Sequence, residues 1–182
     1  MARWELELLG KYFTGEALTL IVAHDWAVAR FAGKICDKIS LSEADCRFVE
    51  EASLLHDIGV CRVHAPEIGM LGEHDYIKHG FLGREILEKE GYPQHALVCE
   101  RHTGVGLTIA DIVSQGLPLP HRDMTPQTLP EQIICFADLF YSKKPGKISQ
   151  QKDPKRVRRK LMRFGEDKVQ IFDNWMEHFW PL

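Results

Sequence analysis

Four histidines and two aspartates along the chain have the types and the order that a metal site needs. They occur as His24, the adjacent pair His56 and Asp57, then His79, His102 and Asp138. The pair lies inside the apolar stretch LLHDIGV, where an imidazole or a carboxylate without a partner is costly to bury. Neutral imidazole and carboxylate are the usual ligands of divalent iron, manganese, zinc, nickel and cobalt. We therefore predict that the six side chains converge on one transition-metal site.

The segments that must position these residues have helical spacing of their apolar positions. Such spacing runs over residues 16–39, which carry His24, and over residues 42–55, which lead to the His-Asp pair. Further helices are expected over residues 75–91, 94–104, 108–115 and 131–142, with two more in the tail. Strand-like alternation is scarce. The sequence thus predicts an all-α fold, a bundle of about six to eight helices with the metal site in its centre.

Composition limits the class of protein. The chain has 182 residues, 45% of them hydrophobic, which fits one globular domain and excludes disorder. Its formal net charge of -3 gives no overall attraction to nucleic acid, so nucleic acid is not an expected partner. The five cysteines are odd in number and lack a C-x-x-C spacing, which favours a reducing cytoplasm over a disulfide framework. No stretch approaches roughly 18 apolar residues, so we expect a cytoplasmic protein without a membrane span.

The order of these residues closely resembles the HD-domain superfamily of metal-dependent phosphohydrolases, and LLHDIG resembles the name-giving motif of its HDIG branch. The resemblance covers about residues 16–142. We expect an HD domain over residues 1–145 and a C-terminal helical extension over residues 146–182 that packs on the domain or on a partner subunit. Homodimerisation stays open.

The resemblance also implies roles for individual residues. His24, His56, Asp57 and Asp138 would hold one metal ion, while His79 and His102, with Asp57 bridging, would hold a second. His74 and His95 could replace His79 and His102 in this role, but we interpret both as surface residues. The two divalent transition-metal ions (Fe, Mn, Zn, Ni or Co) would activate a water as nucleophile, with Asp57 as a catalytic residue. Lys78 and Arg101, each beside a ligand histidine, are predicted to bind phosphate, and Arg122, Lys143 and Lys144 are further candidates.

The implied reaction is hydrolysis of a phosphoester or phosphoanhydride in a small, nucleotide-like metabolite. Val60 stands where the deoxynucleoside 5′-monophosphatases of the family have a glutamate, which disfavours that subgroup. The stretch ERHTGVG looks more like the HD proteins that hydrolyse diadenosine tetraphosphate, and the GYP signature of the cyclic-di-GMP phosphodiesterases is absent.

Two other classes of function compete with the hydrolase. The same six residues resemble myo-inositol oxygenase and the related diiron enzyme that cleaves organophosphonates, so a diiron oxygenase is the alternative. A nucleic-acid-binding module built on KRVRRK at residues 155–160 is disfavoured, because most such runs are solvated helix faces.

Overall fold

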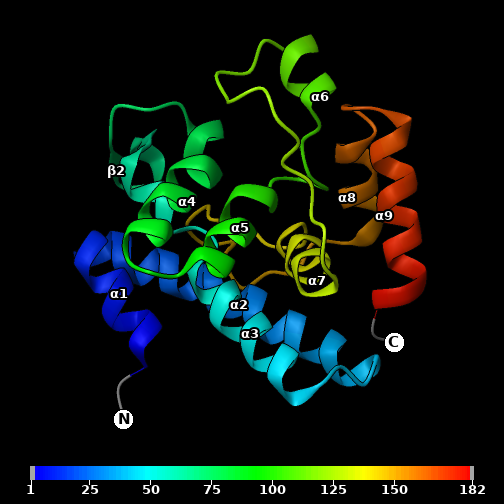
Figure 1. The fold of residues 1–182 in the computed structure, drawn as a ribbon, viewed down its shortest axis with the longest axis horizontal. Helices are drawn as coiled ribbons and strands as arrows, with labels where there is room; N and C mark the ends of the chain where they lie inside the picture. The colour runs from blue at the N-terminus through cyan, green and yellow to red at the C-terminus, as the bar shows by residue number, and fades with distance from the viewer. Residues whose placement is uncertain (1–2, 181–182) are drawn as a thin grey trace.

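The computed structural model describes residues 3–180 as a mainly helical fold (Figure 1). Its α-helices are α1 (Trp4–Tyr12), α2 (Gly15–Lys38), α3 (Glu43–Leu55), α4 (His79–Lys89), α5 (Pro93–Arg101), α6 (Ile109–Ser114), α7 (Leu129–Asp138), α8 (Pro154–Leu161) and α9 (Glu166–Phe179). The all-α prediction is confirmed. These nine helices of the described residues exceed the expected six to eight because residues 4–12 also form a helix.

The connection between α3 and α4 contains the small elements of the fold. These are the 3-10 helices η1 (Ile58–Arg62), η2 (Pro66–Ile68) and η3 (Tyr76–Lys78) and the strands β1 (His64–Ala65) and β2 (Met70–Leu71). The strands pair antiparallel, with Ala65 opposite Met70. Gly69 between them has a φ of 76°, a left-handed conformation that glycine adopts without steric cost. Residues 60–76 therefore form a compact hairpin region before α4.

Local signals in the sequence set several helix ends. The hydroxyl of Ser42, the N-cap of α3, accepts a hydrogen bond from the backbone N–H of Asp45 at 3.1 Å. Thr108 and Asp111 form a reciprocal capping box at the start of α6. Thr128 caps α7 in the same way as Ser42 caps α3. Two of these caps fix the starts of α3 and α7, the helices that lead to the His-Asp pair and to Asp138.

One part of the core lies among α2, α3, α7 and α9. Phe31 of α2, Phe136 of α7 and Phe172 of α9 are all buried, and the ring centroids of Phe136 and Phe172 lie 5.9 Å apart. Burying an aromatic side chain of this size contributes about 1.5–3 kcal/mol. The C-terminal helix is thus packed on α7 of its own chain.

A second apolar cluster lies among α1, the first turns of α2, η1 and α4. It includes Leu9, Ile21, Ile58 and Ile86, each with no exposed surface. Helix α2 contributes to both clusters, since Ile21 belongs to this one and Val28 to the other. His24 lies between these two positions, so the chain places it where the two clusters meet. Within residues 3–180, no helix combines the length and the apolarity needed to cross a membrane.

Candidate metal centre

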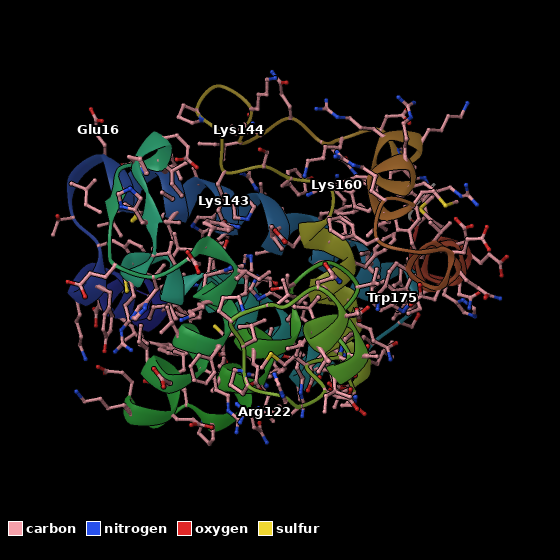
Figure 2. The ribbon with its side chains drawn as sticks, turned by 90° about the horizontal axis from the view of Figure 1, so that it is seen from above. Glu16, Arg122, Lys143, Lys144, Lys160 and Trp175 are labelled. Atoms are coloured by element: carbon pink, nitrogen blue, oxygen red, sulfur yellow. The ribbon has the colours of Figure 1, made fainter. Side chains whose placement is uncertain are left out.

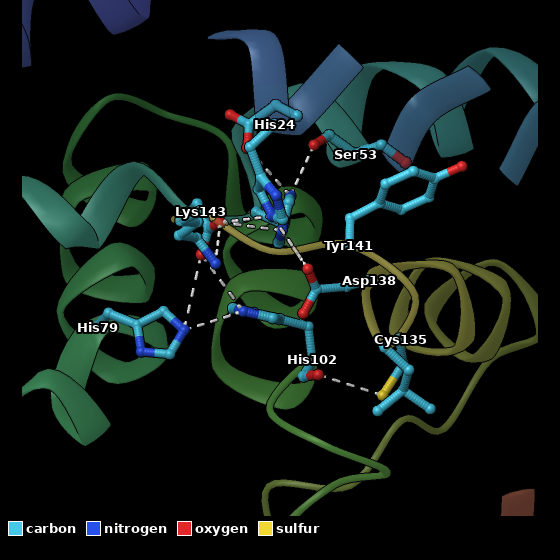
Figure 3. Close-up of polar contacts among 12 residues, drawn as sticks. His24, Ser53, His79, His102, Cys135, Asp138, Tyr141 and Lys143 are labelled. Carbon is cyan, nitrogen blue, oxygen red and sulfur yellow. Dashed lines mark hydrogen bonds and ion pairs between the residues drawn. The ribbon is translucent and has the colours of Figure 1, made fainter. Parts of the chain in front are cut away.

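The structure brings the six predicted ligands together from five parts of the chain (Figure 3). One of them, His24, projects from within α2. The other five lie at helix ends: His56 and Asp57 just after α3, His79 at the first residue of α4, His102 just after α5 and Asp138 at the last residue of α7. The four histidines and Asp57 are buried, while the Asp138 side chain is 19% exposed. The predicted convergence therefore holds in the fold.

The first group of ligand atoms surrounds one oxygen of Asp57. Asp57 Oδ2 lies 3.2 Å from His24 Nε2 and 3.1 Å from His56 Nε2. Asp138 Oδ1 lies 3.0 Å from His24 Nε2 and 3.6 Å from His56 Nε2. Two imidazole nitrogens and two carboxylate oxygens thus face one another, a donor set that suits a divalent transition metal.

The second group surrounds the other oxygen of the same carboxylate. Asp57 Oδ1 lies 3.6 Å from His79 Nε2 and 3.5 Å from His102 Nε2, and these two nitrogens lie 3.0 Å apart. Asp57 therefore faces both groups, one oxygen toward each. This is the geometry in which a single carboxylate can bridge two cations.

Three of the histidines are fixed through Nδ1 by the backbone carbonyl three residues earlier. In each case the distance is 2.7 Å: His56 to Ser53, His79 to Tyr76 and His102 to Cys99. Because a carbonyl oxygen only accepts, each Nδ1 carries the donated proton, so that when the ring is neutral its lone pair lies on Nε2. The lone pairs then point into the site, which is the tautomer that a metal ligand requires. The residues present fit a metal ion.

Glycines allow the elements that carry these ligands to approach closely. A Cβ on Gly59 of η1 would lie 2.0 Å from the carbonyl oxygen of His79 and 2.3 Å from the backbone nitrogen of Gly83. A Cβ on Gly80 would lie 2.6 Å from the carbonyl oxygen of Cys99 on α5. The glycine that follows the His-Asp pair therefore lets η1 pack against α4, with His79 beside Asp57.

Charges inside the site compensate one another. Burial raises the pKa of Asp57, but His56 and Lys143 outweigh burial and hold it well below its usual range. Burial lowers the pKa of His56, yet the adjacent Asp57 raises it well above the ordinary value. Burial, together with neighbouring His102, lowers the pKa of His79 to about 3. Asp57 is thus ionised and His79 neutral near pH 7, as ligands must be, whereas Asp57 keeps His56 protonated, and a bound metal ion would displace that proton.

Lys143, one of the further candidates from the sequence, lies in the centre of the site (Figure 3). Its Nζ is 2.6 Å from Asp57 Oδ2, and its side chain is only 12% exposed. The ammonium group also lies 6.0 Å from the ring centroid of Tyr76. It follows Asp138 by five residues on the segment that leaves α7, so the structure places a cation beside the shared carboxylate.

Asp25 is a residue of the site that the sequence analysis missed. Its carboxylate is fully buried, lies 3.7 Å from His56 Nδ1, and has no hydrogen bond within the described residues. Burial raises its pKa well above the usual range, with Asp57 adding to the effect and His56 opposing it. The signal was present, because His24 and Asp25 repeat the His-Asp pair of residues 56 and 57.

Two of the predicted phosphate-binding arginines are paired with buried glutamates instead. Arg101 donates to both carboxylate oxygens of Glu131 at 3.0 and 3.1 Å. Arg122 donates to Glu100, at 3.0 Å from its Nε. The two glutamates are 5% and 3% exposed, so both need cationic partners, and Glu100 has a second one in Arg84. The sequence shows the arginines but not their acidic partners, which lie 30 and 22 residues away.

The remaining candidates lie outside the group of six. Lys78, in η3, is partly buried and Lys144 is exposed, and within residues 3–180 no polar contact joins either side chain to a candidate ligand.

The expectation of a surface position is wrong for His95, whose side chain is 12% exposed and lies 3.4 Å from Glu51. Its ring packs against Trp4, Phe48 and Tyr92, so the apolar surroundings explain its burial. His74 is partly buried in the hairpin region.

Comparison with known proteins agrees with this geometry. Residues 21–142 match the HD domain family, and this range contains all six candidate ligands. An uncharacterized protein of Methanocaldococcus jannaschii is 36% identical over 121 residues, which are 65% of this chain and 64% of that protein.

Two further relatives are named tRNA (cytidine(56)-2′-O)-methyltransferase. The protein of Picrophilus torridus is 34% identical over 124 residues, and that of Thermoplasma volcanium is 32% identical over 150 residues. These matches cover 68% and 81% of this chain but only 32% and 39% of the two relatives. The chain spans less than two thirds of the length of each curated relative described here. The family match itself covers well over half of the chain, and on this ground the protein belongs to the HD domain family.

Proposed function

We propose that the protein is a metal-dependent phosphohydrolase that cleaves a phosphoester or phosphoanhydride in a small, nucleotide-like metabolite. The observation that carries the proposal is the position of Asp57 between two groups of ligands. One group is His24, His56 and Asp138, and the other is His79 and His102. Two divalent cations held there would supply a water of lowered pKa and positive charge for the phosphate oxygens.

The residues of the chain would contribute binding and orientation. The carbonyl contacts at Nδ1 hold three imidazoles with Nε2 toward the site, so these rings need little reorientation when cations bind. Lys143 carries a positive charge beside Asp57 and would bind a phosphate oxygen of the substrate. Asp138 is the most exposed of the six ligands, so the substrate would enter on the side of α7 and the segment that follows it.

The relatives add to the choice of substrate class. Two of them carry a name that refers to tRNA, which supports a nucleotide-like substrate over a sugar phosphate. The methyl transfer in their name is not part of the proposal, because this chain corresponds to only about a third of each.

All five cysteines are free thiols, which supports a reducing compartment such as the cytoplasm.

Metal analysis and a substrate screen test the proposal. Protein purified without added metal is analysed for bound elements, stripped, and reloaded with manganese, iron, cobalt, nickel or zinc. Each form is then screened anaerobically for phosphate release from nucleotides, dinucleoside polyphosphates and sugar phosphates. We expect anaerobic release from a nucleotide-like substrate with at least one metal. Turnover that requires dioxygen and iron would instead support the diiron oxygenase.

The matched variant for this screen is Asp57→Ala. Because one carboxylate serves both groups of ligands, we expect the variant to lose both cations and all turnover. Circular dichroism of the variant serves as the control for folding. Full activity in the folded variant would contradict the bridging role and, with it, the proposed mechanism.

A further inference from the structure

The charges of the chain are segregated, although its net charge is small and negative. Residues 143–163 contain ten of the 23 lysines and arginines but only one of the 26 acidic residues, Asp153. The rest of the chain keeps 13 basic residues against 25 acidic ones. We call residues 143–163 the basic segment. The charge of this segment is positive, opposite in sign to the net charge of the whole chain. The net charge is therefore a poor guide to what this surface attracts.

Most of these charges point away from the protein. Val157 and Leu161 of α8 are buried against the domain. Successive residues of an α-helix are about 100° apart, so Lys155, Arg156, Arg159 and Lys160 share the face opposite Val157 and Leu161, about 140° wide. All four are exposed, as is Arg163 just after the helix. Arg158 lies outside this face and pairs with Asp173 of α9 at 3.0 Å. One arginine of α8 thus pairs with α9, while four other cationic side chains form an exposed row.

The basic segment also reaches the candidate metal centre through its first residue, Lys143. The segment between α7 and α8 is fixed at one end by Lys143, which pairs with Asp57, and at the other by Lys152. The backbone N–H of Lys152 donates to the carbonyl of Phe140 at 2.8 Å, and its Nζ donates to that of Leu139 at 3.0 Å. Figure 2 shows Lys143, Lys144 and Lys160 on one side of the molecule and Arg122 on the other. The start of α8 is therefore held next to the end of the helix that carries Asp138.

We propose that the exposed face of α8 and the adjoining loop bind the phosphate backbone of a single nucleic acid strand and lead it toward the metal centre. Side chains three or four residues apart on a helix are about 5–6 Å from one another, a spacing that lets them reach successive phosphates of an extended strand. Phe164, 54% exposed at the end of the row, offers an aromatic face on which a base can stack, and Met162, 44% exposed, offers a further apolar contact.

Other polyanions fit this surface less well. A helix that binds a membrane buries its apolar face in the lipid, whereas the apolar face of α8 already packs on the domain. An acidic protein would need a complementary surface of similar length, whereas the basic segment offers its exposed cations as one narrow row. This inference stands apart from the proposed hydrolysis, since binding needs no turnover.

Fluorescence anisotropy with a labelled single-stranded RNA of about 20 nucleotides tests the inference. The comparison probes, measured under the same conditions, are a DNA strand of the same sequence, an RNA duplex, polyglutamate and phosphatidylserine vesicles. The variant Arg156→Glu, Arg159→Glu, Lys160→Glu should bind the RNA at least tenfold more weakly than the wild type. Its slope of log K against log salt should fall by about 2, since three phosphate contacts are lost at roughly 0.7 each.

The matched control reverses three exposed cations on other helices, Lys34→Glu, Arg47→Glu and Lys89→Glu. It changes the net charge by the same amount, and we expect its affinity for the RNA to stay within twofold of the wild type. The inference is overturned if the wild type does not bind the RNA strand at low salt, or if the control variant weakens binding as much. Equally tight binding of the duplex, polyglutamate or the vesicles would overturn it as well.

Discussion

The Nε2 atoms of His79 and His102 lie 3.0 Å apart, although each ring donates its proton through Nδ1 to a backbone carbonyl. When both rings are neutral, two nitrogen lone pairs face each other in a buried position. Protonation of His79 does not relieve this contact at neutral pH, because burial and His102 lower its pKa to about 3. A divalent cation held by both nitrogens and by Asp57 would relieve it, and so this pair of histidines tests whether a second cation binds.

Replacing His102 should remove one of two metal ions. We expect His102→Ala to bind about one cation per chain where the wild type binds two, and to lose at least the 10- to 100-fold in activity that loss of a metal-site partner costs. Elemental analysis of the purified proteins gives the stoichiometry. His121→Ala changes an exposed histidine and should leave both cations in place. Two cations in His102→Ala would show that this histidine is not a ligand.

Lys143 should matter for turnover, whereas its neighbour Lys144 should not. Lys143 Nζ lies 2.6 Å from Asp57 Oδ2, while the Lys144 side chain is exposed. We expect Lys143→Met to lower kcat/KM about 100-fold, the scale on which loss of one preorganised charged donor acts. Lys144→Met serves as the control in the same steady-state assay with added metal. Equal activities of the two variants would exclude the proposed phosphate contact.

Gly59 should be far less tolerant of a methyl group than Gly33. A Cβ on Gly59 would overlap the carbonyl oxygen of His79 at 2.0 Å, whereas a Cβ on Gly33 of α2 meets nothing within 4 Å. We expect Gly59→Ala to lower the free energy of unfolding by about 1–3 kcal/mol or more and to weaken metal binding. Gly33→Ala should raise it by about 0.5–1 kcal/mol, since alanine favours a helix interior. Urea unfolding measures both, and an unchanged stability in Gly59→Ala would rule out the close packing of η1 on α4.

Lys152 should make stability depend on alkaline pH. Burial, with repulsion from Lys160 and Lys143, lowers its pKa to about 8 in the folded state, below the ordinary value of 10.5. The unfolded chain therefore binds more protons between pH 8 and 10.5, and the contribution of Lys152 to stability rises as the pH rises through this window. Urea unfolding at several pH values should show the wild type gaining stability relative to Lys152→Met from pH 8 to 10.5. A constant difference between the two proteins would contradict the lowered pKa.

The sequence alone determined the class of fold and the identity of the six candidate ligands. Helical periodicity is a local property, so apolar positions three and four residues apart reveal each helix without knowledge of its neighbours. The same holds for caps such as Ser42. The ligands could be recognised because imidazoles and carboxylates at the ends of apolar helices need partners, and because their order resembles a known family.

Only the tertiary structure decided which charges meet. Their positions in the sequence made Arg101 and Arg122 candidates for phosphate binding. The fold pairs them with the buried Glu131 and Glu100. Lys143 lies beside Asp57 because the fold brings the segment after α7 against the residues that follow α3, and no local pattern in the sequence encodes that contact. The pairing of a charge depends on which helix ends come together in space, and residues far apart in the chain meet only when the core has packed.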